Sequence, residues 1–150
     1  SIPVIASGGI IDARGMAGAM ALGAQGVYMG TRFVATEECI AHPTYKEALL
    51  GAIDTGTVLA GGLHKTNRIL RTDKALQLRD NVPTNSIDAA NYWDATLSPD
   101  QVRGALLDGD LEGSIAYCGS GVGLISEIMP ASQVVSSLVD GASHIVKTLG

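Results

Sequence analysis

The chain has 150 residues, of which 46% are hydrophobic and 17% charged, and its formal net charge is −5. This composition is typical of a folded globular domain with a sizeable core and excludes a disordered chain. The negative charge argues against nucleic acid and against an anionic membrane surface as partners, because both favour a basic face.

The cysteine content and the length of the apolar runs indicate the cellular compartment in which we expect the protein. Cys39 and Cys118 are the only two cysteines, and they give neither a disulfide framework nor the spacing of metal ligands. We expect both to be reduced structural thiols. No apolar run reaches the roughly 18–20 residues of a membrane span, and no signal peptide is visible. We therefore expect a cytoplasmic protein that binds no metal.

The chain begins with a predicted βαβ unit. The unbroken apolar run of residues 2–6 predicts a buried parallel strand, and residues 27–29 predict a second one. Between them, Asp12 is a suitable N-cap for a helix that ends at Gly23-Ala24-Gln25-Gly26. A buried strand needs neighbours on both sides, and few other strands are predicted. We therefore expect this chain to be the C-terminal part of a longer protein.

Both predicted strands are followed by glycine and a small polar residue, in Ser7-Gly8-Gly9 and in Gly30-Thr31. Strands of a βαβ unit run parallel, so the two turns leave the sheet at the same edge. Glycine lets the main chain approach a ligand closely, and main-chain amides can hold a phosphate without a lysine. Each turn alone is also common before a helix. Together they predict a phosphate cradle for a nucleotide or a flavin.

The remainder of the chain is mostly helical in pattern. Helical spacing or start signals predict helices over about 43–53 and from Ser98-Pro99 to about residue 108, and a final amphipathic helix over 132–149. For residues 73–80 one or two helical turns are an option. Residues 57–60 are a possible short strand, 61–68 are expected to be loop, and 81–97 lack a clear period. A second glycine-rich passage covers residues 115–123.

The segment IPVIASGGIIDARGMAGAMALGAQGVYMGTRFVATEE resembles the closing part of the FMN-dependent nitronate monooxygenases, formerly called 2-nitropropane dioxygenases. The flavin-dependent enoyl-acyl-carrier-protein reductases share the pattern. The resemblance continues more loosely at NRILRT (67–72) and at GDLEGSIAYCGSGVGLI (109–125). Family members often have glutamine where this chain has Tyr28, and their SAGQ-like turn is Tyr117-Cys118-Gly119-Ser120 here.

This resemblance implies an α/β fold that is the C-terminal part of a TIM barrel, with strands 7 and 8 present here and a mainly helical lobe. The implied segments are barrel units in 1–60, the lobe in 61–113, and in 114–150 a glycine-rich turn with a C-terminal helix that docks on the barrel. The resemblance also implies FMN as cofactor, bound at Gly8, Gly9, Tyr28, Met29, Gly30 and Thr31.

By the same resemblance, the substrate is a small molecule, an alkyl nitronate oxidised with O2. An NAD(P)H-dependent enoyl reductase is the alternative enzyme. A catalytically inactive phosphate-binding half-barrel is the alternative outside enzymes, because two barrel strands cannot close. The partner would then be the missing N-terminal barrel half or a second copy of the chain.

Other polar residues are weaker candidates. Arg32 could contact the phosphate or pair with Glu37 or Glu38. His42 suits the start of a helix and His144 a solvated helix face, which leaves His64 as the one histidine worth testing for catalysis. Asp108, Asp110 and Glu112 fit a solvated helix end better than a calcium loop. No catalytic residue is assigned.

Overall fold

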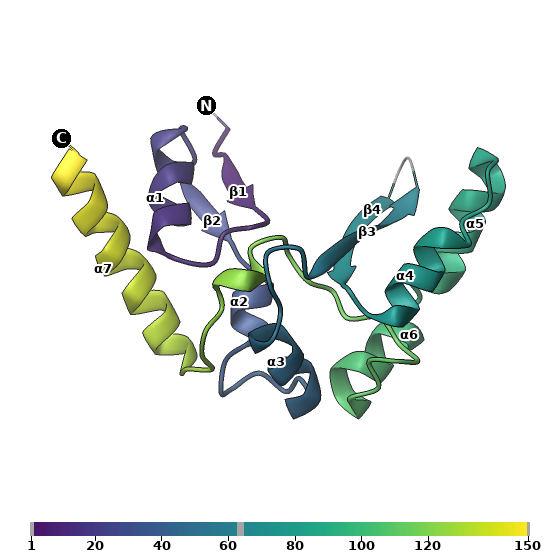
Figure 1. Ribbon diagram of the computed structural model, residues 1–150. Helices are drawn as coiled ribbons and strands as arrows, with labels where there is room; N and C mark the ends of the chain where they lie inside the picture. The colour runs from purple at the N-terminus through teal and green to yellow at the C-terminus, as the bar shows by residue number, and fades with distance from the viewer. Residues whose placement is uncertain (1, 63–64, 150) are drawn as a thin grey trace.

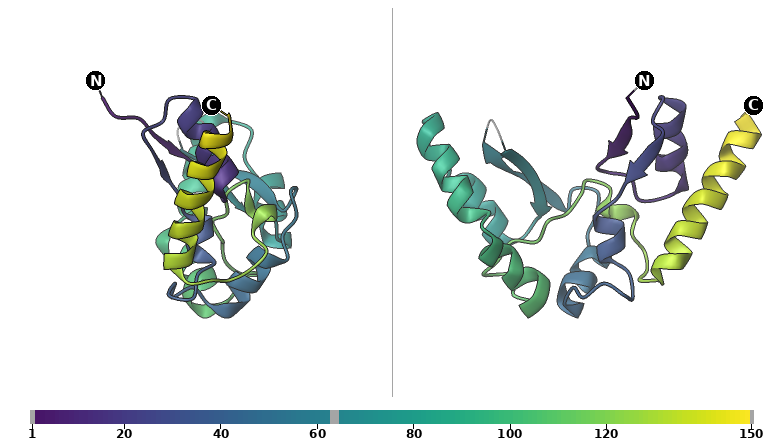
Figure 2. Two further views of the ribbon diagram at one scale, coloured as in Figure 1. Left: turned by 90° about the vertical axis from the view of Figure 1, so that its left-hand side faces the viewer. Right: turned by 180° about the vertical axis from the view of Figure 1, so that it is seen from behind.

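The computed structural model describes residues 2–62 and 65–149. Its elements form two arms that meet at a shared base (Figure 1). One arm carries the strand pair β1–β2 with helices α1 and α7, and the other carries the hairpin β3–β4 with helices α4, α5 and α6. Helices α2 and α3 and the segment after α6 lie at the base. The view from behind shows the same two arms (Figure 2).

The first arm contains the expected βαβ unit. Strands β1 (Ile5–Ser7) and β2 (Gly26–Tyr28) pair in parallel, with α1 (Ala13–Ala21) between them in sequence. The Asp12 carboxylate accepts hydrogen bonds from the main-chain N–H groups of Arg14 and Gly15, as expected of an N-cap. Gly23 follows the helix in the left-handed region at φ 102°.

The base of the molecule has its own hydrophobic core. Helix α2 (Thr31–Val34) follows β2, and α3 (Pro43–Leu50) begins where Pro43 predicts a first turn. Tyr45 and Leu49 of α3 pack with Ile11 and with residues of the later segment 116–125, including the 3-10 turn η2 (Val122–Leu124). The second glycine-rich passage therefore returns to the end of the strand pair.

The second arm differs from the sequence-based expectation. Strands β3 (Thr57–Gly62) and β4 (Lys65–Leu70) form an antiparallel hairpin, so the expectation of loop over 61–68 is wrong. The hairpin also runs across the expected segment boundary at residues 60 and 61. Helix α5 (Ser86–Thr96) occupies most of the stretch that was expected to be irregular. Its single buried residue, Trp93, explains the missing apolar period.

The other helices of this arm begin at a capping threonine and at a proline. Helix α4 (Asp73–Asp80) begins after Thr72, whose hydroxyl accepts from Ala75 N–H, and α6 (Pro99–Arg103) begins at the predicted proline. A π-helical turn, η1 (Gly104–Asp108), follows α6 and ends at Gly109 in the left-handed region. The hairpin, α4 and α5 enclose one core cluster, which contains Val58, Ile69 and Trp93.

The last helix, α7 (Ala131–Leu149), confirms the expected amphipathic helix and packs along α1. Its buried residues Val134, Leu138 and Ala142 recur at helical spacing. The approach to α1 is close, since a Cβ on Gly141 would lie 2.6 Å from the Ala13 Cβ. No helix in the described ranges is both long and apolar enough to cross a bilayer.

The expectation of a buried first strand is wrong for the described chain. Val4 and Ile5 are 60% and 56% exposed, and no residue of β1 or β2 is fully buried. Helix α1 lies against this pair, and each strand pairs only with the other among the described residues. Apolar sequence therefore predicted the strand but not its burial, because burial needs partners on both faces.

Candidate functional site

The carboxyl ends of β1 and β2 bring the two predicted glycine turns together. Ser7 and Tyr28 are the last register partners of the parallel pair, so Gly8 and Met29 both leave the sheet at one edge. Gly8 and Gly9 take φ values of 91° and 72°, in the left-handed region that favours glycine. The local chain thus requires glycine there.

A third segment, residues 117–121, lies against both turns. The Gly119 N–H donates a hydrogen bond to Thr31 Oγ1 at 2.8 Å. A Cβ on Gly119 would lie 3.3 Å from Thr31 Oγ1 and 3.7 Å from the Gly9 nitrogen. A Cβ on Gly121 would lie 2.6 Å from the Gly9 carbonyl oxygen. The glycines of this segment therefore allow it to pack directly on the main chain of the first turn.

The Thr31 hydroxyl is oriented by this contact. Because its oxygen accepts from Gly119, its own hydrogen is directed elsewhere and can be donated. Within residues 2–62 and 65–149, the main-chain N–H groups of Gly9 and Gly30 make no hydrogen bond. A Cβ on Gly30 would meet nothing within 4 Å. These donors and this open space fit an anionic group such as a phosphate.

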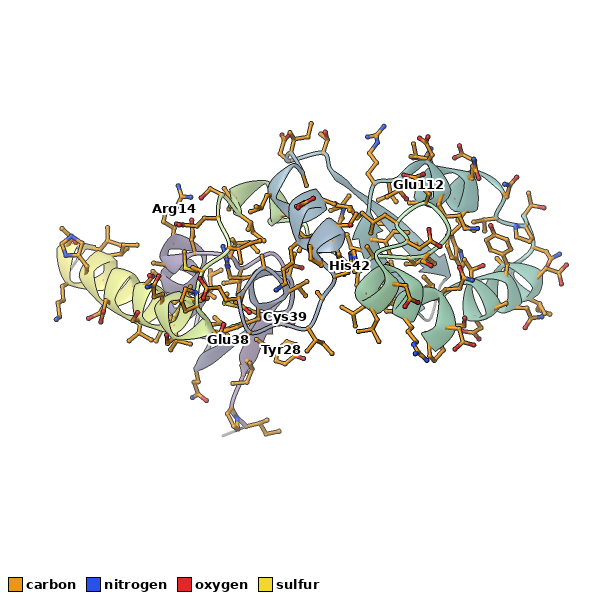
Figure 3. All side chains as sticks on the ribbon, turned by 90° about the horizontal axis from the view of Figure 1, so that it is seen from below. Arg14, Tyr28, Glu38, Cys39, His42 and Glu112 are labelled. Carbon is orange, nitrogen blue, oxygen red and sulfur yellow. The ribbon has the colours of Figure 1, made fainter. Side chains whose placement is uncertain are left out.

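A cavity of about 510 Å³ joins the turns to the second arm. All six residues expected to bind the cofactor line it: Gly8, Gly9, Tyr28, Met29, Gly30 and Thr31. Tyr28 is 69% exposed, and its side chain stands outside the ribbon (Figure 3). The structure therefore brings the predicted residues to one cavity, with Tyr28 at its rim.

The second arm and the base complete the cavity with residues that were not among the expected cofactor-binding positions. Asn67 and Arg68 come from β4, Tyr117 and Cys118 precede Gly119, Val102 belongs to α6 and Leu106 to η1. The sequence carried no clear signal for this hairpin, because Gly61 and Gly62, which favour a loop, are paired residues of β3.

Two buried groups near the cavity stay protonated at neutral pH. Burial raises the pKa of the Cys118 thiol to about 12, although the Arg68 charge acts to lower it. Burial also raises the pKa of Tyr45, whose hydroxyl donates to the Tyr117 carbonyl. Cys118 is therefore an unreactive structural thiol, and Cys39 is also free, as expected.

Arg32 takes neither of its two expected roles. Its guanidinium donates to the carbonyl oxygens of Ala35 and Glu127, and the residue is only 5% exposed. Burial lowers its pKa, and the Glu127 charge partly offsets this. Arg32 lines a different cavity, beside α7, rather than the cavity of the glycine turns. Glu38 instead accepts from Ala131 N–H at the start of α7.

The other polar candidates that the structure describes lie at a helix cap, on an exposed helix face or in a turn. The His42 ring nitrogen accepts from Thr44 N–H at the start of α3, and His144 is exposed on α7. His64 lies outside the described residues. Asp110 accepts from Gly113 N–H in a turn. Residues 2–62 and 65–149 contain no group of side chains that could hold a metal ion.

A family model and a curated relative show the family of this chain. The nitronate monooxygenase family model matches residues 1–141. A nitronate monooxygenase of Pseudomonas aeruginosa is 33% identical over 93% of this chain and 39% of its own length.

Two solved structures are similar over nearly the whole chain. FabK from Thermotoga maritima has a TM-score of 0.87 and 41% identity over 99% of this chain and 47% of its own. A nitroalkane oxidase from Streptomyces ansochromogenes has a TM-score of 0.75 and 25% identity over 100% of this chain and 42% of its own. The chain thus spans less than half the length of each of these three relatives. Because the family model covers 141 of 150 residues, the chain belongs to the nitronate monooxygenase family.

Proposed function

We propose that this chain forms the phosphate-binding part of an FMN-dependent oxidoreductase that oxidises alkyl nitronates with O2. The observation that carries the proposal is the convergence of two glycine turns and one oriented threonine on a single cavity. The family supports flavin chemistry of this kind, and the similarity to a nitroalkane oxidase supports the substrate class.

In this proposal the main chain holds the cofactor phosphate. The N–H groups of Gly9 and Gly30 and the Thr31 hydroxyl donate to its oxygens, and Gly8 allows the close approach. Each hydrogen bond to a charged oxygen contributes about 1.5–3 kcal/mol net, so three can hold the anion without a lysine. Tyr28 and Met29 border the cofactor at the rim. The bound FMN supplies the redox chemistry, and the protein positions it.

We further propose that β1 and β2 are strands 7 and 8 of a TIM barrel, with residues 61–113 as the lobe over the pocket and 114–150 as the segment that closes on the barrel. The exposed apolar side chains of Val4 and Ile5 support this, because parallel sheets are covered on both faces. The covering strands come from an N-terminal barrel half or from a second copy. No described residue is assigned as the catalytic base.

The decisive experiment places a carboxylate in the proposed phosphate site. Gly30 has φ −101°, which any residue adopts, and its Cβ direction is open, so Gly30→Asp should fold. In the complete protein containing this chain, we expect FMN affinity to fall by at least about tenfold through charge repulsion. Gly18→Asp is the matched control, since that Cβ direction is also open. Equal FMN affinity in the two variants would refute the site.

A second enzyme function is supported by the 41% identity to FabK. On that basis the same flavin site would serve an NAD(P)H-dependent enoyl thioester reductase. Substrate-dependent NADH oxidation would favour this reductase, and nitrite release from a nitronate would favour the monooxygenase. Turnover by residues 1–150 alone, compared with the complete protein, tests whether this part is inactive by itself.

A further inference from the structure

The cavity of the glycine turns has one charged side chain among its described lining residues, and that side chain is Arg68. Arg68 lies on β4, in the arm opposite the glycine turns (Figure 1). Its strand neighbour Ile69 is buried against Trp93 in the lobe. Successive strand residues point to opposite faces, so Arg68 belongs to the face turned away from the lobe core.

Arg68 is held in place without a carboxylate. Its Nη1 donates to Thr57 Oγ1 at 2.9 Å, and its main-chain oxygen accepts from Cys118 N–H at 3.0 Å. Among the described residues, no Asp or Glu forms an ion pair with it. A guanidinium carries five N–H donors, and one is used by Thr57. The residue is half-buried and lines the cavity, so its other donors are available to a ligand at reduced exposure to water.

The cavity therefore has two separate sets of anion-binding groups. Main-chain amides and Thr31 lie at the ends of β1 and β2, and the guanidinium lies on β4. The first set suffices for a phosphate, because each hydrogen bond to a charged oxygen is strong. Arg68 is left for a second anion, and its planar fork matches a planar group with two equivalent oxygens.

We propose that Arg68 binds the planar two-oxygen anion of the substrate, a nitronate or a carboxylate, and so selects the anionic form over the neutral one. This inference rests on the proposed function, because it assumes that the glycine turns take the cofactor. It also separates the two enzyme candidates, since a thioester carries no such anion at its reacting end. Arg68 is thus a specificity-determining residue that the proposed phosphate site does not include.

The test uses isobutyrate, a carboxylate with the shape of a secondary nitronate, and isobutyramide, its neutral counterpart. Binding of each is measured by calorimetry in the complete protein containing this chain. We expect Arg68→Gln to weaken isobutyrate binding by about tenfold and isobutyramide binding by less than about twofold. Arg71→Gln is the matched control, because Arg71 is exposed and lines a different groove. It should leave both ligands within about twofold.

Three results would overturn the proposal. In one, the wild-type protein binds the two ligands equally. In another, Arg68→Gln weakens both ligands equally. In the third, Arg68→Gln weakens FMN but not riboflavin, which would assign Arg68 to the cofactor phosphate. Failure of the proposed function is distinct, because it appears as unchanged FMN affinity in Gly30→Asp.

If circular dichroism shows that Arg68→Gln does not fold, two other variants test the proposal in its place. Arg68→Lys keeps the positive charge but loses the planar, paired N–H donors of the guanidinium. Isobutyrate binding should therefore weaken by about threefold. Thr57→Val removes the hydroxyl that holds Nη1 and should weaken isobutyrate binding more than isobutyramide binding. Wild-type affinity for isobutyrate in both variants would contradict the proposal.

Discussion

The two small sheets of this molecule differ in how they are covered. The hairpin β3–β4 packs one face on α4 and α5, and Val58, Ile69 and Trp93 are buried there. The parallel pair β1–β2 lies against α1, and its side chains are half-buried or exposed. The hairpin thus carries its own core, while the strand pair carries the binding turns. The difference shows that apolar sequence specifies a strand, whereas burial depends on what packs against it.

Replacing one isoleucine by alanine in each sheet should reveal the largest difference in stability between them. Ile69 of β4 is 1% exposed and Ile5 of β1 is 56% exposed. We expect Ile69→Ala to lower the free energy of unfolding by about 2–5 kcal/mol, because it leaves a cavity. Ile5→Ala in residues 1–150 should cost less than about 1 kcal/mol. Urea unfolding followed by circular dichroism measures both changes.

Repeating the Ile5→Ala measurement in the complete protein extends this test. If further strands cover β1 there, the cost of Ile5→Ala should rise towards that of Ile69→Ala. A small cost in both proteins would mean that β1 stays exposed, and it would contradict the proposed barrel.

The contact between the third glycine segment and the first turn gives the next largest effect. A Cβ on Gly121 would lie 2.6 Å from both the Gly9 carbonyl oxygen and the Ile11 side chain. We expect Gly121→Ala to cost about 1–3 kcal/mol of stability through overpacking, and to weaken FMN binding by displacing the turn. Gly18→Ala, where the Cβ direction is open, should leave FMN affinity unchanged. Stability measurements and FMN titrations on the two variants check these expectations. Unchanged FMN affinity in Gly121→Ala would mean that segment 117–121 does not help to form the FMN site.

Alkaline pH should lower the stability of the region formed by α2, α3 and the segment after α6. We expect this effect to be smaller than those of the substitutions. The pKa of Cys118 is raised from an ordinary value of 9.0 to about 12 because the thiol is buried. The unfolded thiol therefore ionises first, and stability present below about pH 9 is lost as the pH rises towards 12. Tyr45, with its raised pKa, adds to the loss in the same direction.

We expect the urea midpoint of the wild type to fall more steeply between pH 9 and 11 than that of Cys118→Ala. Cys39→Ala, which removes the half-buried thiol, is the control for the loss of a thiol as such. Identical pH profiles for Cys118→Ala and the wild type would mean that the buried thiol does not contribute.

Much of the local structure could be predicted from sequence because strong local signals fixed it. Asp12 caps α1, Pro43 begins α3, Pro99 begins α6, and the apolar stripe of α7 is buried as expected. The two glycine turns were also recognisable, since positive φ at Gly8 and Gly9 excludes most other residues. Their roles in ligand binding stay a prediction.

Other elements could not be predicted because their signals are tertiary. Strand β4 contains polar Asn67 and Arg68, which both line the cavity, so its sequence resembles a loop. Helix α5 buries only Trp93, so it shows no apolar period. Arg32 follows a glycine turn in sequence, yet it points towards Glu127, 95 residues away. Neither its distant partner nor its cavity is visible from neighbouring residues.

Local sequence signals suffice to predict the βαβ unit, the glycine turns and the final helix, because caps, glycine conformations and helical periods act over a few residues. Which surfaces meet around the cavity depends instead on tertiary packing. Segment 117–121 joins the two turns through Gly119, and β4 adds Arg68 from the other arm. These contacts join residues far apart in the chain, so packing of the whole molecule, rather than any local preference, places them together.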